Sequence, residues 1–115
     1  ADPDYLHLSP TRRSSDLGKF KAEEAMQYRP LFVGAVSVEI VLFVTPPASW
    51  SQKKQRAALD GDIFPTSKPD IDNVIKGIFD ACNEIVWQDD KQVVNVAVRK
   101  RYAQVAQAKV EVYAL

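Results

Sequence analysis

Residues 70–83 carry the clearest α-helical pattern of apolar residues in this sequence. Their apolar side chains recur at intervals of three and four residues, which places them along one helical face. Asp70 stands where this helix begins, and a carboxylate there suits the free N–H groups of a first turn. We predict a helix from Asp70 to Asn83 whose buried face is formed by Ile71, Val74, Ile75, Ile78, Phe79 and Cys82.

Three further segments have the composition and alternation of β-strands. Residues 33–44 are dense in β-branched side chains, and alternate positions form one apolar face. Residues 93–102 alternate in the same way, and residues 109–114 form a shorter run. Between the helix and the strand at 93–102 we predict a brief strand at 85–87 and a turn at 88–91.

Two other helices are expected earlier in the chain. Residues 19–29 are rich in helix-forming residues and stop at Pro30. Residues 52–59 follow Ser51, a residue type that caps helices. The order is helix, strand, loop, helix and then two or three strands, which predicts an α+β fold. We expect a small mixed, largely antiparallel sheet with helices packed on one face.

Residues 1–17 differ in composition from the rest of the chain. They lack sustained periodicity, and the run at 9–17 resembles the translation of a common sequencing adapter. We interpret this segment as non-native or disordered and place the folded domain at residues 18–115. A genuine polar tail is the alternative. On our interpretation, Tyr5, Leu6 and Leu8 should not form a paired strand.

Composition narrows the class of protein. The 115 residues fit one domain, and a core this small favours burial against a second copy. The single cysteine, Cys82, excludes a disulfide framework and a cysteine-rich zinc site. No apolar run approaches the ~18 residues of a membrane span, and no signal-peptide pattern opens the chain. We therefore expect a cytoplasmic protein with no membrane partner.

Two acidic pairs carry the candidate chemistry. Asp70 and Asp72 lie at the start of the predicted helix, with Lys76 one turn further along, and Asp89 and Asp90 follow later. A helix of ~13 residues spans about 20 Å, and a strand returning at about 3.3 Å per residue covers a similar distance. We therefore predict that the carboxylates of Asp70, Asp72 and Asp90 lie within about 8 Å of one another.

Each pair also has an ordinary explanation when it is considered alone. Asp70 and Asp72 suit a helix cap and a surface pair with Lys76, and Asp89-Asp90 suits a hairpin turn. Together, carboxylates without histidine or cysteine ligands favour a hard cation, Mg²⁺ or Mn²⁺. Such a cation polarises a phosphoryl oxygen, and Lys76 can stabilise charge on the phosphate. The pattern predicts phosphodiester hydrolysis.

Four motifs surround these residues: Lys-Pro-Asp-Ile-Asp-Asn-Val-Ile-Lys at 68–76, Phe-Asp-Ala at 79–81, Val-Trp-Gln-Asp-Asp-Lys-Gln-Val-Val at 86–94 and Lys-Arg-Tyr at 100–102. Over residues 65–103 the chain resembles the RusA family of Holliday-junction resolvases, and the likeness extends more loosely over residues 46–54. The two paired-acid motifs at this separation are the specific part of the resemblance.

This resemblance implies a role for each acidic residue. Asp70, Asp72 and Asp90 match the family's essential metal-site acids, Lys76 matches its essential lysine, and Asp89 is an auxiliary ligand. The resemblance also implies a homodimer that needs Mg²⁺ and cuts four-way (Holliday) DNA junctions by symmetric paired nicks in recombination and repair. Relatives begin with a strand. Because the adapter-like run holds those positions here, we expect the sheet to lack that strand.

Basic residues lie on either side of the acidic motifs, although the net charge of the chain is zero. We expect residues of the 53–56 loop to contact phosphates, with Trp50 stacking on an unpaired base. A solvated basic loop is the alternative. The predicted DNA contacts are Lys53, Lys54, Arg56, Lys68, Arg99 and Arg101.

Two other functions remain open. A metal-dependent phosphohydrolase acting on small nucleotides needs a closed pocket, but the chain has no Gly-rich phosphate loop to build one. A non-catalytic DNA-binding dimer needs none of the acids, whereas Asp70, Asp72, Asp90 and Lys76 are all present.

Overall fold

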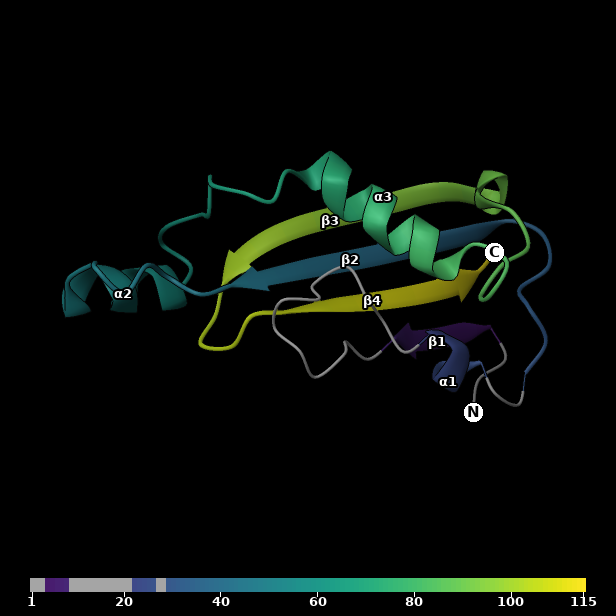
Figure 1. The fold of residues 1–115 in the computed structure, drawn as a ribbon, viewed down its shortest axis with the longest axis horizontal. Coiled ribbons are helices and arrows are strands. Elements are labelled where there is room, and N and C mark those ends of the chain that lie inside the picture. Colours follow the sequence, from purple (N-terminus) through teal and green to yellow (C-terminus); the bar gives the residue numbers. More distant parts are fainter. Residues whose placement is uncertain (1–3, 9–21, 27–28) are drawn as a thin grey trace.

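Four strands form one mixed sheet in the order β1-β4-β2-β3 (Figure 1). The computed structural model describes residues 4–8, 22–26 and 29–115. β4 pairs antiparallel with both β1 and β2, whereas β3 pairs parallel with β2. The predicted mixed, largely antiparallel sheet of an α+β fold is therefore confirmed. The strands are β1 (Tyr5–Leu8), β2 (Val36–Val44), β3 (Val93–Tyr102) and β4 (Gln107–Ala114).

The helices occupy three different places around this sheet. α3 (Ile71–Cys82) lies across one face of the sheet, and α1 (Ala22–Ala25) packs beside β1 (Figure 1). α2 (Gln52–Leu59) lies beyond the end of the sheet, so the prediction that the helices pack on one face is wrong for α2. α1 falls inside the helix predicted at 19–29, part of which lies outside the described residues.

The core lies between α3 and the facing side of β2, β4 and β1. The register of β2 and β4 sets Val38 opposite Val112 and Ile40 opposite Val110, and all four side chains are buried. Trp87 is the largest fully buried side chain, and its ring meets the edge of Phe79 at a centroid distance of 5.7 Å. Burial of this apolar surface is the main stabilising contribution to the fold.

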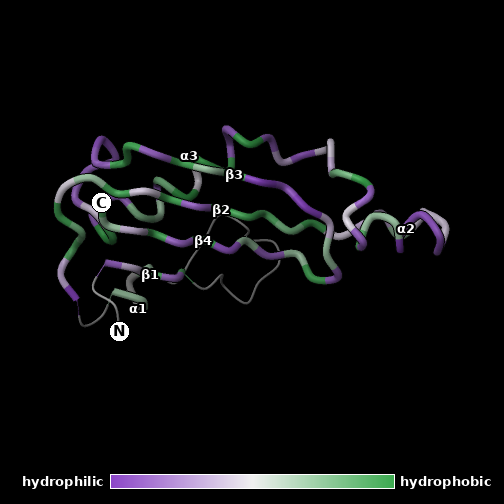
Figure 2. Tube along the Cα trace, turned by 180° about the vertical axis from the view of Figure 1, so that it is seen from behind, coloured by the Kyte–Doolittle hydropathy of each residue, from purple (hydrophilic) through white to green (hydrophobic). Residues whose placement is uncertain are grey.

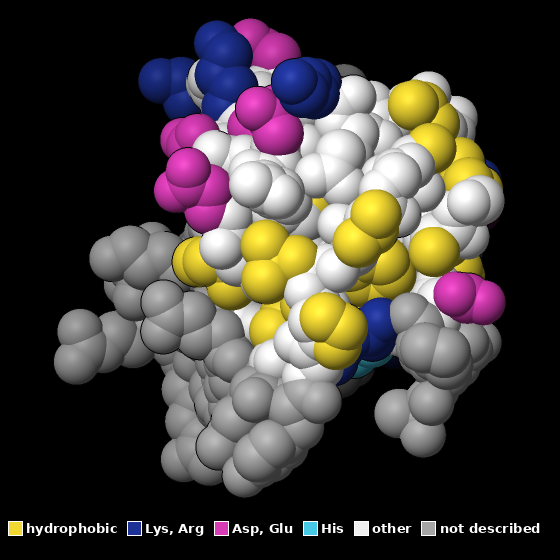
Figure 3. Space-filling view, turned by 90° about the vertical axis from the view of Figure 1, so that its right-hand side faces the viewer, with side chains coloured by type: hydrophobic (Ala, Val, Ile, Leu, Met, Phe, Trp, Pro, Cys, Tyr) yellow, Lys and Arg dark blue, Asp and Glu magenta, His cyan; other side chains and the backbone are white. Residues whose placement is uncertain are grey.

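β3 is an edge strand whose helix side is only partly covered. Val94 is 63 % exposed and Val96 is 39 % exposed, whereas Val98 is half-buried. α3 crosses the sheet obliquely and leaves the first half of β3 open (Figure 1). The end of the molecule at which β2 and β3 begin also exposes apolar side chains, with charged side chains gathered along one edge (Figure 3). In the described part of the chain, the outer edge of β3 pairs with no strand.

The N-terminal prediction is wrong for the residues that the structure describes. β1 pairs with β4, setting Leu6 opposite Val112 and Leu8 opposite Val110. Both leucines are buried, because alternation in the sequence Tyr-Leu-His-Leu directs them to the core side. Strand pairing joins backbone groups, so an unusual sequence does not prevent it. The expectation that the sheet lacks an N-terminal strand is therefore also wrong. The remainder of residues 1–17 lies outside the described part.

The segment after α3 turns instead of extending. Glu84 has a φ of 66°, and its N–H donates to the carbonyl of Trp87 at 2.7 Å. Trp87 makes only isolated bridges, with Phe32 and Asn83, so the strand predicted at 85–87 is wrong. Because of this tight turn, residues 84–87 stay near the C-terminal end of α3.

Candidate functional site

The N-terminal end of α3 presents the first acidic pair to solvent. Asp70 occupies the N-cap position with an extended backbone, but its side chain makes no capping hydrogen bond. Asp72 in the first turn and Lys76 one turn later are both exposed. The capping role considered for the Asp70 side chain is therefore not realised. Its carboxylate and that of Asp72 are both exposed to solvent, where a ligand can reach them.

The second acidic pair lies in the short 3-10 helix η1 (Asp90–Gln92) and just before it. The Asp89 side chain accepts a hydrogen bond from the backbone N–H of Lys91 at 2.9 Å and so caps η1. The indole N–H of Trp87 donates to Oδ1 of Asp90 at 2.8 Å. Gln92 donates to the carbonyls of Phe32 and Gly34, tying η1 to the loop before β2. Asp90 is therefore half-buried and held in one orientation.

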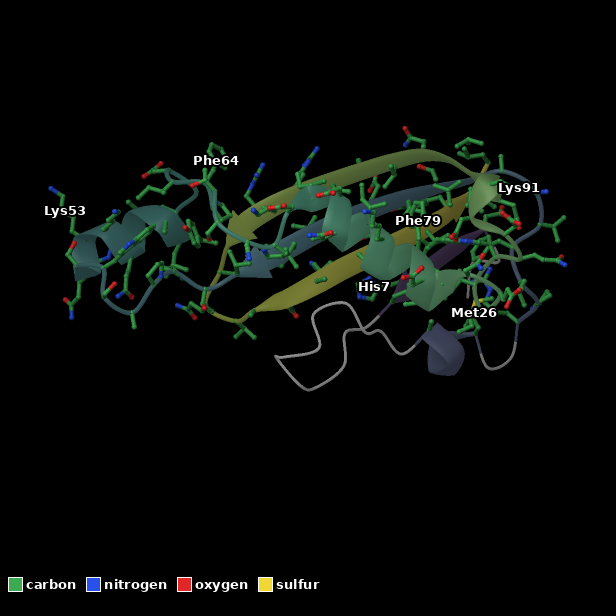
Figure 4. All side chains as sticks on the ribbon, turned by 45° about the horizontal axis from the view of Figure 1, so that its top comes forward. His7, Met26, Lys53, Phe64, Phe79 and Lys91 are labelled. Atoms are coloured by element: carbon green, nitrogen blue, oxygen red, sulfur yellow. The ribbon has the colours of Figure 1, made fainter. Side chains whose placement is uncertain are left out.

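Asp90 lies at the opposite end of α3 from Asp70. Burial, and after it the nearby negative charge of Asp90, raises the pKa of the Cys82 thiol to about 12. Cys82 is the last residue of α3, a helix of 12 residues that is about 18 Å long. Phe64 and Lys91, which flank the two acidic pairs in the chain, lie near opposite ends of β3 (Figure 4).

At neutral pH the Cys82 thiol is protonated and buried, as expected of a small core residue.

Within one chain, the structure does not bring the three predicted metal acids together. Among the described residues, no three His, Cys, Asp or Glu side chains lie close enough to hold a metal ion. The predicted spacing of Asp70, Asp72 and Asp90 is therefore wrong for a single chain. The prediction needed an extended return along residues 85–90, and the turn at Glu84 replaces it.

α2 projects beyond the end of the sheet (Figure 1), and we call it, together with Trp50 and Ser51 before it, the arm. It carries the basic residues Lys53, Lys54 and Arg56. Ser51 caps α2 by accepting from the N–H of Lys54 at 3.2 Å, as predicted, and Gly61 follows its end with a φ of 89°. Residues 52–56 are hydrophilic (Figure 2), and Lys53 points away from the body of the molecule (Figure 4). The arm can therefore offer cationic side chains to a ligand that also reaches α3.

Trp50 supports this arm. Its ring meets Tyr102 of β3 edge-on at 5.5 Å, and the Lys54 ammonium lies 4.0 Å from the ring centroid. Gln55 donates a hydrogen bond to the Trp50 carbonyl at 3.0 Å. The half-buried indole therefore fixes α2 to the end of β3, which is a structural role that the sequence analysis did not assign.

The remaining predicted DNA contacts lie around the end of β3. Arg99 is exposed on the face opposite α3, whereas Lys100 points to the α3 side and its ammonium donates to the Ser67 carbonyl. Arg101 is half-buried, and its guanidinium lies 4.9 Å from the centre of the Phe64 ring. Lys68 is exposed beside Asp70. Sequence reasoning did not single out Phe64, because an apolar residue in a loop gives no signal that it will be exposed.

The fold and these side chains define a small α+β protein with paired exposed acids and a basic arm, a combination suited to a polyanionic ligand. The family model of endodeoxyribonuclease RusA matches residues 10–113, so the chain belongs to the RusA endodeoxyribonuclease family. A protein of Bacillus subtilis (strain 168), the uncharacterized protein YqaN, is 36 % identical over 103 residues, which cover 86 % of this chain and 72 % of that protein.

We found no apolar run in the sequence long enough to span a membrane. In the part of the chain that the structure describes, no helix has the length and apolar character needed to cross a membrane.

Proposed function

We propose that this chain is a Mg²⁺-dependent endodeoxyribonuclease that resolves four-way DNA junctions by paired nicks in recombination and repair. The proposal is supported by membership of the RusA family together with one structural observation. Asp70 stands at the N-cap of α3 without capping it, beside an exposed Asp72 and Lys76. A carboxylate pair left open in this way, with a cation on the same helix, suits the cleavage of a phosphodiester.

The chemistry of these donors fits a hard divalent cation. Asp70, Asp72 and Asp90 would hold Mg²⁺, with Asp89 as an auxiliary ligand and Mn²⁺ as an alternative ion. When bound, the ion supplies Lewis-acid activation of the phosphate and of a water nucleophile. Lys76, one turn along α3 from Asp72, stabilises negative charge on the phosphate.

A homodimer formed through the edge of β3 would complete this acid set. In the described part of the chain β3 is a strand of 10 residues with an unpaired outer edge and exposed Val94 and Val96, and an edge of this kind is a template for pairing with another chain. Two identical edges pair antiparallel about a two-fold axis, which is the commonest symmetry of oligomers. A second copy of this chain is therefore the partner that the edge suits.

In such a dimer each metal site would draw acids from both chains. Asp90 precedes the start of β3, whereas Lys100 near its end is tied to Ser67, three residues before Asp70. Antiparallel pairing sets the start of one β3 beside the end of the other. Asp90 of the second copy would then approach Asp70 and Asp72 of the first. On this proposal two chains together would assemble the sequence-based acid set, which one chain alone does not assemble.

The direct test is cleavage of a labelled four-way junction, with linear duplex DNA and small nucleotides as competing substrates. With Mg²⁺ we expect paired nicks in the junction, slow or absent cleavage of the duplex, and no turnover of nucleotides. Junction binding without cleavage in Mg²⁺ or Mn²⁺ would instead identify a non-catalytic DNA-binding protein. Preferential hydrolysis of a small nucleotide would identify a phosphohydrolase.

The arm predicts a salt dependence that can be measured separately. If Lys53 at the tip of the arm contacts a phosphate, Lys53→Gln should lower the slope of log affinity against log salt by about 0.9. Lys109→Gln is the matched control, because Lys109 is also an exposed lysine but lies on β4 and not on α2. Binding isotherms between 50 and 200 mM salt, roughly the range over which such contacts are lost, measure both slopes. Equal slopes for the two variants would contradict the prediction that Lys53 on the arm contacts a DNA phosphate.

A further inference from the structure

Phe64 is a large aromatic side chain that the structure leaves 58 % exposed. It lies between α2 and α3, and its neighbours are anchored, since Ile63 is half-buried and Pro65 is buried. The ring projects outward above the end of β3 (Figure 4). Of the aromatic residues that the structure describes, Phe64 alone has an exposed side chain. An exposed apolar residue is by itself ordinary on a protein surface, but a ring held in one position by a cation offers a ligand a flat apolar face.

A cation holds the ring in place. The guanidinium of Arg101 lies 4.9 Å from the centre of the Phe64 ring, a separation at which a guanidinium stabilises an aromatic face. Arg101 is itself oriented by a 2.9 Å hydrogen bond from Nη1 to the carbonyl of Lys100. The pair is therefore a preformed cation–π contact in which Phe64 stays 58 % exposed.

Phe64 lies in the loop that leads into α3, a few residues before the exposed acidic pair. The Lys100 ammonium donates to the Ser67 carbonyl and so ties the chain between Phe64 and Asp70 to the end of β3. Lys68 is exposed in the same stretch. A ligand on the ring would thus meet the Arg101 guanidinium, and the exposed Lys68 and the candidate metal acids follow Phe64 closely in the chain. Such surroundings suit a phosphate-bearing ligand with a flat apolar part, which is a nucleotide of DNA.

We propose that Phe64 and Arg101 form a stacking platform for an unpaired base at the branch point of the DNA substrate. The proposal rests on the proposed function, because it places the base beside the phosphate to be cut. Within a duplex both faces of each base are covered by neighbours, so the ring has nothing to stack on. At a branch point a base can leave the stack and place its π-face on an aromatic side chain. Phe64 thereby favours branched DNA over linear duplex and acts as a specificity-determining residue.

Three single substitutions test the platform. Phe64→Leu keeps an apolar side chain but removes the flat ring, and Phe64→Tyr keeps the ring. Val33→Ala is the control, because Val33 is 90 % exposed at the other end of the sheet. Affinities for a four-way junction and for linear duplex are measured with Ca²⁺ in place of Mg²⁺, since Ca²⁺ also takes oxygen ligands. Circular dichroism confirms that each variant is folded.

We expect Phe64→Leu to bind the junction about five- to a hundredfold more weakly, which is the worth of one stacked base, and to bind duplex like the wild type. Phe64→Tyr and Val33→Ala should bind both DNAs like the wild type. If the wild type cuts junctions but Phe64→Leu binds them with wild-type affinity, the platform is refuted and the nuclease proposal stands.

The converse result separates the two proposals. If the wild type cuts no DNA in Mg²⁺ but Phe64→Leu loses junction affinity, the platform stands and the nuclease proposal fails. A wild type that binds no junction at all contradicts both.

Discussion

Asp72→Asn is expected to slow junction cleavage at least about a hundredfold, while junction affinity stays within about twofold. The amide has the shape of the carboxylate but is a poor ligand for a hard cation, and its neutrality adds no repulsion toward DNA. Asp72 is exposed in the first turn of α3, so the substitution removes no core contact. Single-turnover cleavage of a labelled junction and a parallel binding titration measure the two quantities.

Asp80→Asn is the matched control for this change. Asp80 is an exposed acid two turns further along the same helix, and its substitution makes the same change in charge and shape. We expect its cleavage rate to equal that of the wild type. A comparable loss in both variants would mean that the charge of the helix matters, and not a metal ligand at Asp72.

Mixing two inactive variants distinguishes a site shared between chains from a site within one chain. In a dimer with shared sites, a mixed pair of Asp72→Asn and Asp90→Asn subunits contains one site with both substitutions and one intact site. Since about half of randomly formed dimers are mixed, about a quarter of the sites should recover, and each active dimer should nick one strand only. Asp90→Asn keeps Oδ1 as the acceptor for the Trp87 indole. No recovery on mixing would place each site within a single chain.

Trp87→Ala is expected to lower the free energy of unfolding by about 3–5 kcal/mol. Trp87 is fully buried, packs against Phe79 and donates to Asp90, so the truncation removes core packing and a buried hydrogen bond together. Domains of this size have only about 5–15 kcal/mol of stability, so the substitution should remove a large share of it and lower the denaturation midpoint clearly. Urea denaturation followed by circular dichroism gives the difference.

Trp50→Ala is the control for the loss of an indole. Trp50 is half-buried on the arm, where its edge-on contact with Tyr102 contributes about 1 kcal/mol. If Trp87→Ala cost no more than Trp50→Ala, Trp87 would not be the centre of the core.

Much of the fold could be predicted from local signals. The bounds of α2 and β3 agree with the sequence-based ranges, and those of α3 differ only by the capping residues, because caps and apolar periodicity act within a few residues of the chain. β1 was not predictable from composition, because residues 1–17 differ from the rest of the chain, and the alternation of Leu6 and Leu8 is its one local signal. The exposure of Val94 depends on how far α3 reaches across the sheet, which alternation within one strand cannot show.

The site was predictable in its residues but not in its geometry. Asp70 and Asp72 stand together at the start of α3 because they are two residues apart on one element. The position of Asp90 depends on the direction of the chain after α3, which the left-handed backbone of Glu84 decides. A glutamate gives no sequence signal for that conformation, which L side chains rarely adopt. An estimate from element lengths alone therefore placed Asp90 beside the wrong end of the helix.

The length of β3 has a consequence for the DNA product. In the proposed dimer the two metal sites lie at opposite ends of the paired β3 strands. The length of β3 therefore sets the distance between the sites, at about 3.3 Å per residue. Removing two residues would keep every side chain on its face and draw the sites closer by about 7 Å, whereas removing one would invert the faces. The number of residues in β3 would thus set the spacing of the two nicks, independently of any base that the protein contacts.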